Sequence, residues 1–409
     1  MADLTMSAMS GSIDRNALLL FYATSTPGDH CTIAYGDPGG GKTTVGAAVA
    51  RVLGAADDHV VRWSAPQMDV PDYNGYATPR ADGLHFECSA DIRRVCDGQP
   101  AMFIVDEIGN ADRSIQGAML KPLDSRTIGE QKIPESCRMV GFLNPPETTT
   151  DMQDLAFALM NRAVWFPWER VTDDEHVAYM RARRDTRTSI RLPEWCGTEA
   201  WWKAYDEVCA IYATYKLKLH EGMLWEDPRA DEVKVRWPMC AASPRSWDLF
   251  LRLCATCRVY GDTVAMRTFG KGTIGEPQTN VWLNFYTTQD LMGGEELVAD
   301  VHGPRTWKPD PRRTDQTFAQ LGIVGSWATN GTGLSDKALL KRWHDGWDVV
   351  RYVLECGEGE DVALLCAQDL FTKMPKGGLL QGYEDVVNRF RALTVATSLF
   401  DDANAVAKE

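Results

Sequence analysis

Long apolar runs are missing from this chain of 409 residues. The apolar burst near its start, residues 17–23, follows acidic rather than basic residues and is too short to cross a bilayer. The sequence therefore predicts neither a signal peptide nor a membrane span. Low-complexity tracts and internal repeats are also missing, and 44% apolar with 24% charged residues is ordinary for a globular protein. The length suggests two or three domains, each with its own core.

Basic residues are outnumbered, with 43 Lys and Arg against 57 Asp and Glu and a formal net charge of −14. An acidic chain repels phosphodiester backbones at long range, so nucleic acid is not the expected partner. The one dense basic segment, residues 180–191, is expected to be a solvated helix end or a salt-bridging surface.

Paired cysteine motifs are scarce. The 11 cysteines are scattered, and the one close pair, Cys254 and Cys257, falls in an amphipathic helical pattern where core packing is expected rather than metal binding. An odd number of unpatterned thiols is typical of a reducing compartment, so we expect a cytoplasmic protein.

Short apolar segments alternate with helical patterns in the first 170 residues or so. Buried strands are predicted at 31–36, 59–64, 100–107 and 138–144, and helices at 13–24, 42–53, 90–98 and 111–124. This alternation predicts an α/β fold with a parallel sheet. Residues 65–86 are expected to be turn-rich, and residues 126–137 to form a hairpin. Beyond Trp168 the patterns become helical at 198–222, 243–261 and 313–400, with an irregular stretch at 262–310.

The stretch "GDPGGGKTT" follows the apolar run "CTIAY" and fits the pattern GxxxxGK[ST]. Between a strand and a helix, such a loop cradles phosphates with backbone N–H groups and the helix dipole. Lys42 would bridge the β- and γ-phosphates, and the Thr43 hydroxyl would ligate Mg²⁺. The candidate nucleotide-binding residues are Gly36, Asp37, Pro38, Gly39, Gly40, Gly41, Lys42, Thr43 and Thr44.

Two acids end the predicted third strand in "FIVDE". Asp106 would hold the Mg²⁺ shell with Thr43, and Glu107 would orient and polarise the attacking water. A GTP-dependent switch would carry a base-reading NKxD, which this sequence lacks. The paired acids therefore favour a hydrolysing motor or remodeller.

Three further polar residues follow these motifs. Asn144 ends the predicted fourth strand in "FLNPPE", where it could bind the water or the γ-phosphate, although Asn-Pro is also a common turn. Arg162 lies in "LMNRAVWF", and Arg245 lies at a predicted helix start in "AASPRSW". Because an arginine at a helix N-terminus opposes the dipole, Arg245 should have an anionic partner, either a γ-phosphate or a structural carboxylate.

The order of these motifs resembles the AAA+ ATPases. Within them it looks most like the MoxR branch and its relatives, which include magnesium chelatase subunits, McrB and the dynein/midasin modules. The stretches that carry the resemblance are "DEIGNADRSIQGAMLKPLDSRTIGEQKIP", "FLNPPE" and "AASPRSWDLFL", within residues 30–260. Two departures stand out: Gly109 replaces the branch's Asn, and Asn161 precedes the finger arginine in place of Asp.

The resemblance implies ATP and Mg²⁺ as cofactors, a hexameric ring and a helical lid. It implies Asn144 as first sensor, Arg162 as the finger given to the neighbouring subunit, and Arg245 as second sensor. The implied domains are a nucleotide-binding core over 1–168 with a short N-terminal helix, a lid over 169–265, and a mainly helical C-terminal region over 266–409.

The function that follows is an ATP-hydrolysing ring that remodels or activates a protein partner, which the resemblance suggests is a von Willebrand factor A domain. An alternative is a nucleic-acid-associated motor like the McrB relatives, against which the net charge counts. A third is a nucleotide-gated scaffold that hydrolyses little, against which Glu107 counts. Tyr73 and Tyr76 lie where AAA+ rings can line a central pore, but packing of this loop at a subunit interface is the favoured explanation, because MoxR-type rings often lack a clear threading aromatic.

Overall fold

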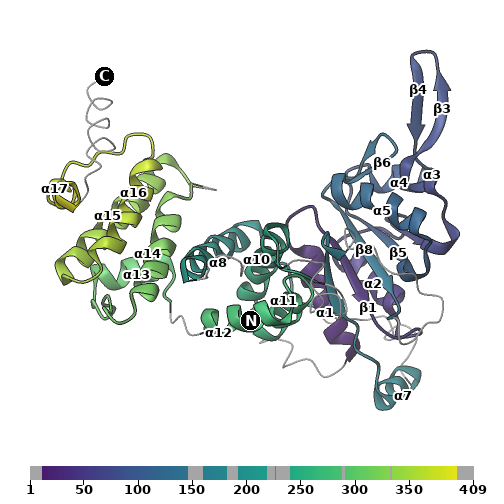
Figure 1. The fold of residues 1–409 in the computed structure, drawn as a ribbon, viewed down its shortest axis with the longest axis horizontal. Coiled ribbons are helices and arrows are strands. Elements are labelled where there is room, and N and C mark those ends of the chain that lie inside the picture. The colour runs from purple at the N-terminus through teal and green to yellow at the C-terminus, as the bar shows by residue number, and fades with distance from the viewer. Residues whose placement is uncertain are drawn as a thin grey trace. The chain divides into compact units, whose positions relative to one another are not determined.

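The computed structural model describes residues 12–145, 160–181, 192–218, 226, 240–287, 291–331 and 334–393. Its contacts divide the chain into two compact units, Met1–Gly197 with His220–Leu283 and Thr198–Leu219 with Asn284–Glu409 (Figure 1). This grouping differs from the predicted divisions after residues 168 and 265. The long helix expected within the lid, at 198–222, falls almost entirely in the second unit. The chain from His220 to Leu283 belongs to the first.

Five parallel strands form the central sheet of the first unit, in the order β2-β5-β8-β1-β9. They are β1 (Cys31–Tyr35), β2 (Val60–Ser64), β5 (Ala101–Asp106), β8 (Cys137–Leu143) and β9 (Ala163–Pro167). The predicted α/β fold with a parallel sheet core is confirmed. The sequence did not indicate β9, because "AVWFP" is short and ends in a proline, which is a weak strand signal.

The strand register aligns the carboxyl ends of the sheet. Ser64 lies opposite Asp106, and Tyr35 lies between Leu143 and Pro167. Residues that follow these strands therefore meet at one edge, the edge where open α/β sheets bind their ligands.

Helices accompany this sheet, and several of them contact its strands. In the first unit they are α1 (Ser12–Ser25), α2 (Lys42–Val52), α3 (Val70–Asn74), α4 (Ala90–Val95), α5 (Arg113–Ser125), α7 (Asp173–Arg181), α10 (Pro244–Val259), α11 (Thr263–Lys271) and α12 (Glu276–Thr287), which crosses the unit boundary. Helix α2 contacts β5 and β8, and a Cβ at its Gly46 would come 3.1 Å from the Phe142 ring. The glycine thus lets the helix approach the sheet closely.

The irregular structure predicted at 262–310 is wrong, because α11, α12 and α13 (Gly294–His302) lie there. The Asp262 carboxylate caps α11 by accepting a hydrogen bond of 2.8 Å from the Ala265 N–H. The basic segment at 180–191 lies almost entirely outside the described residues.

Two hairpins lie on the first unit. Residues 126–137 contain the predicted one, β6 (Thr127–Ile128) with β7 (Gln131–Lys132). The turn-rich stretch instead holds α3 and a second hairpin, β3 (Tyr76–Arg80) with β4 (Gly83–Glu87), which extends beyond the sheet in Figure 1. Tyr73 is completely buried and belongs to the core, whereas Tyr76 at the start of β3 is 48% exposed.

The second unit is helical, as predicted for the C-terminal region. Its helices are α8 (Thr198–Lys218), α13, α14 (Thr314–Thr329), α15 (Asp336–Cys356), α16 (Glu360–Thr372) and α17 (Glu384–Leu393). Helix α14 packs against α8, α13, α15 and α16 around a core that includes Trp343 and Trp347. Among the residues that the structure describes, no helix combines the length and apolar character that a membrane crossing needs.

Candidate functional site

The glycine-rich loop joins β1 to α2 at the carboxyl edge of the sheet. Gly39 and Gly41 have φ angles of 76° and 77°, a left-handed conformation that other residues adopt only with strain. Gly41 is the N-cap of α2 and has no side chain to occupy the first N–H groups of the helix. Those donors and the positive end of the helix dipole are therefore available to an anion, as in a phosphate-binding loop.

Lys42 lies folded back over this loop and is only 7% exposed. Its Nζ donates hydrogen bonds to the Gly36 and Asp37 carbonyls at 2.6 and 2.8 Å, and to Asn144 Oδ1 at 2.9 Å. Burial lowers the Lys42 pKa. The structure thus brings Asn144, at the tip of β8, to the loop lysine, as the strand order requires.

Thr43 and Asp106 meet beside the loop. The Thr43 hydroxyl donates to Asp106 Oδ2 at 2.5 Å, and the other carboxylate oxygen accepts the Glu107 N–H at 2.9 Å. A hydroxyl and a carboxylate oxygen are the hard ligands that Mg²⁺ prefers. With the uncapped helix N-terminus next to them, these two residues fit a nucleotide-bound Mg²⁺.

Glu107 follows Asp106 and is exposed, with a left-handed φ of 57°. Few non-glycine residues adopt this conformation, and those that do are enriched at functional sites. Its Oε2 accepts a hydrogen bond of 2.8 Å from the Ser64 hydroxyl at the end of β2. Ser64 was not among the predicted site residues, although β2 pairs with the strand that carries the acids.

Trp168, just beyond β9, is a second residue that sequence reasoning missed. Its indole Nε1 donates to the Gly40 carbonyl at 2.9 Å, and its backbone N–H donates to the Tyr35 carbonyl at 2.7 Å. A Cβ at Gly36 would lie 2.6 Å from the Trp168 carbonyl oxygen, so only glycine fits there. Trp168 therefore fixes the back of the phosphate loop.

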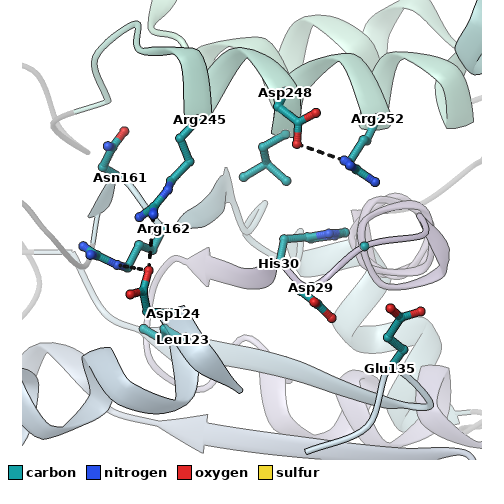
Figure 2. Close-up of a pocket in the computed structure, with 12 residues that line it drawn as sticks. Asp29, His30, Leu123, Asp124, Glu135, Asn161, Arg162, Arg245, Asp248 and Arg252 are labelled. Atoms are coloured by element: carbon teal, nitrogen blue, oxygen red, sulfur yellow. Dashed lines mark hydrogen bonds and ion pairs between the residues drawn. The ribbon is translucent and has the colours of Figure 1, made fainter. Parts of the chain in front are cut away.

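Arg162 and Arg245 come together on one carboxylate, that of Asp124 at the end of α5 (Figure 2). Asp124 Oδ1 accepts from Arg162 Nε at 3.0 Å and lies 3.3 Å from Arg245 Nη2. The Arg162 guanidinium, with a smaller contribution from Arg245, holds the pKa of Asp124 below its ordinary value. The anionic partner expected for Arg245 is thus a carboxylate in this structure.

These arginines line a pocket of about 380 Å³ together with His30 and Arg252. The residues that line this pocket include neither the phosphate loop nor Asp106 or Glu107. The predicted site residues therefore form two groups: one around the loop, and one around Asp124.

The comparisons with known proteins name no family for this chain. No protein-family model matches the sequence, and no curated protein matches it. Among solved structures, one match is described as a "putative ATPase" from Cytophaga hutchinsonii ATCC 33406. It is 13% identical over 64% of this chain and 80% of that chain, with a TM-score of 0.40. A likeness this distant says nothing about the reaction, which must be inferred from the side chains themselves.

Proposed function

We propose that this chain is an ATP-hydrolysing enzyme of the AAA+ class, on its MoxR branch, that works as a ring and remodels a protein partner. The observation that carries the proposal is the contact between Thr43 and Asp106 beside the uncapped N-terminus of α2. Thr43 lies in the first turn of α2 and bonds to Asp106, so two candidate Mg²⁺ ligands lie beside a helix end that can bind an anion. Glu107 follows Asp106 directly in the sequence.

Each residue of the loop group has a distinct task in this proposal. Lys42 exchanges the Gly36 and Asp37 carbonyls for phosphate oxygens, while Thr43 and Asp106 hold Mg²⁺. Glu107 orients the attacking water, and Asn144 reports on the γ-phosphate through the contact it already makes with Lys42. When bound, Mg²⁺-ATP supplies the γ-phosphoryl group that is transferred to water.

The arginine group supports a shared active site. Arg162 and Arg245 line a pocket that does not include the phosphate loop, so we assign them to the nucleotide of a neighbouring copy. Six copies is the number that the resemblance suggests. A von Willebrand factor A domain is the protein partner it suggests, and the net charge of −14 opposes a nucleic-acid track.

The test measures phosphate release by the full-length protein and by Glu107→Gln. Magnesium-dependent ATP turnover by the wild type is expected, with loss of turnover but not of ATP binding in Glu107→Gln. DNA and RNA, added at physiological salt, should leave the rate unchanged. Absence of hydrolysis by the wild type would refute the enzyme assignment, and strong stimulation by either nucleic acid would favour a motor on that polymer instead.

A further inference from the structure

Three elements that are far apart in sequence converge on one oxygen atom in the first unit. Asp124 is near the end of α5, Arg162 precedes β9, and Arg245 lies in the first turn of α10. Both guanidinium groups lie within 3.3 Å of Asp124 Oδ1 (Figure 2). No two of the three residues are close in sequence, so only the fold brings them together.

Charge explains why this convergence needs Asp124. Two guanidinium groups this close repel each other, and Arg245 also opposes the dipole of α10. One shared carboxylate offsets both the repulsion between the arginines and the unfavourable interaction with the helix dipole. The three side chains together then carry a formal charge of +1. The contact uses Nε of Arg162 and one Nη of Arg245, and a guanidinium carries five N–H donors, so Asp124 engages only part of each group.

We propose that Asp124 is a positioning residue, which holds Arg162 and Arg245 as a pair so that both can take a phosphoryl oxygen from a neighbouring copy. This inference rests on the proposed function, in which the pair serves that neighbour's nucleotide. The side chains of Asp124 and Arg245 are 48% and 51% exposed and that of Arg162 is 23% exposed, and ion pairs that solvent reaches are weak. A phosphoryl group can therefore attract the two guanidinium groups while the carboxylate keeps them next to each other.

The same pocket provides a matched control. On α10, Asp248 Oδ2 accepts a hydrogen bond of 3.0 Å from Arg252 Nε, so this acid is paired with a different arginine, which has no assigned role. Asp124→Asn and Asp248→Asn remove the same charge from two walls of one pocket. An effect of pocket charge alone would appear in both variants, whereas positioning of the pair would appear only in the first.

The first measurement is the rate at which phenylglyoxal modifies each arginine, followed by peptide mass spectrometry on the full-length protein without nucleotide. The reagent attacks the unprotonated guanidine, which a carboxylate partner disfavours. Asp124→Asn should speed modification of Arg162 and Arg245 severalfold and leave Arg252 unchanged. Asp248→Asn should do the reverse. Unchanged rates at Arg162 and Arg245 in Asp124→Asn would overturn the inference.

ATP turnover is the second measurement. Asp124→Asn should lower kcat about tenfold with KM for ATP unchanged, Asp124→Glu should restore part of it, and Asp248→Asn should match the wild type. If Arg162→Ala is inactive while Asp124→Asn equals the wild type, this inference fails and the proposed function stands. If the wild type itself does not hydrolyse ATP, the proposed function fails, and the modification rates alone decide whether Asp124 holds the pair.

Discussion

The two groups of candidate residues are built in different ways. Around the phosphate loop, backbone geometry sets the positions: two glycines are left-handed, a third leaves no room for a side chain, and Lys42 is almost fully buried against carbonyls. Around Asp124, charge sets the positions, because two arginines share one carboxylate, and the side chains of Asp124 and Arg245 are about half exposed while that of Arg162 is 23% exposed.

This difference matches what each half of the proposed shared centre would have to do. A loop that receives phosphates must keep its shape in the absence of ligand, since disorder there would have to be removed at each binding event. An arginine that reaches into another chain must be able to move when that chain arrives. Buried hydrogen bonds suit the first task, and exposed ion pairs, which cost little to break, suit the second.

The largest effect is expected from Lys42→Ala, which tests the group around the phosphate loop. The variant loses the only cation of the loop and the contact with Asn144, so ATP binding and turnover should both fall to background. Fluorescent-nucleotide titration and phosphate release measure these losses. Lys132→Ala, which removes an exposed lysine on the β6–β7 hairpin, is the control. Wild-type ATP affinity in Lys42→Ala would show that this loop does not bind the nucleotide.

Arg162→Ala tests the group around Asp124. The protein should fold and bind ATP, but turnover should fall by about 10³ or more, the range reported for arginine fingers supplied by a neighbour. Mixing makes the test sharper, because Arg162→Ala keeps Glu107 while Glu107→Gln keeps Arg162. Co-assembled mixtures should regain part of the activity that each variant lacks alone. Full turnover by Arg162→Ala on its own would exclude this arginine from the reaction.

The same contrast explains what the sequence could predict. The loop, the two acids, Asn144 and four of the five strands follow from contiguous motifs, because each motif specifies its own backbone and the parallel sheet aligns the strand ends. Asn144 reaches Lys42 for that reason, although 102 positions separate them. The roles of all these residues remain predictions until they are measured.

Ser64, Trp168 and Asp124 could not be predicted in the same way. Ser64 lies 43 positions before Glu107, and Trp168 lies 128 positions after Gly40. Each has its place because of strand order or helix packing, and neither serine nor tryptophan carries a motif of its own. For Arg245 the helix dipole indicated an anionic partner, but only the fold identifies that partner as Asp124.

Ser64→Ala should have an intermediate effect that belongs to the chemistry rather than to binding. The hydroxyl holds one oxygen of Glu107 at 2.8 Å, and one such hydrogen bond is worth about 1 kcal/mol, or about fivefold in rate. We expect kcat to fall by that factor with ATP affinity unchanged. Ser125→Ala, which removes an exposed hydroxyl bonded to its own helix, is the control. A rise in kcat would mean instead that Ser64 restrains Glu107.

An effect of similar size, on binding rather than on chemistry, is expected from Trp168→Phe, which loosens the phosphate loop without removing any ligand of the nucleotide. Phenylalanine keeps a ring at this position but loses the indole N–H that donates to the Gly40 carbonyl. Loss of one hydrogen bond of about 1 kcal/mol should raise the Kd for ATP about fivefold, while kcat changes little. Trp165→Phe makes the same chemical change at a buried donor to Met160, which is not part of the loop, so its Kd should stay at the wild-type value. Equal shifts in both variants would show a general loss of core stability, and a shift in Trp168→Phe alone would show that the preformed loop is what binds phosphate tightly.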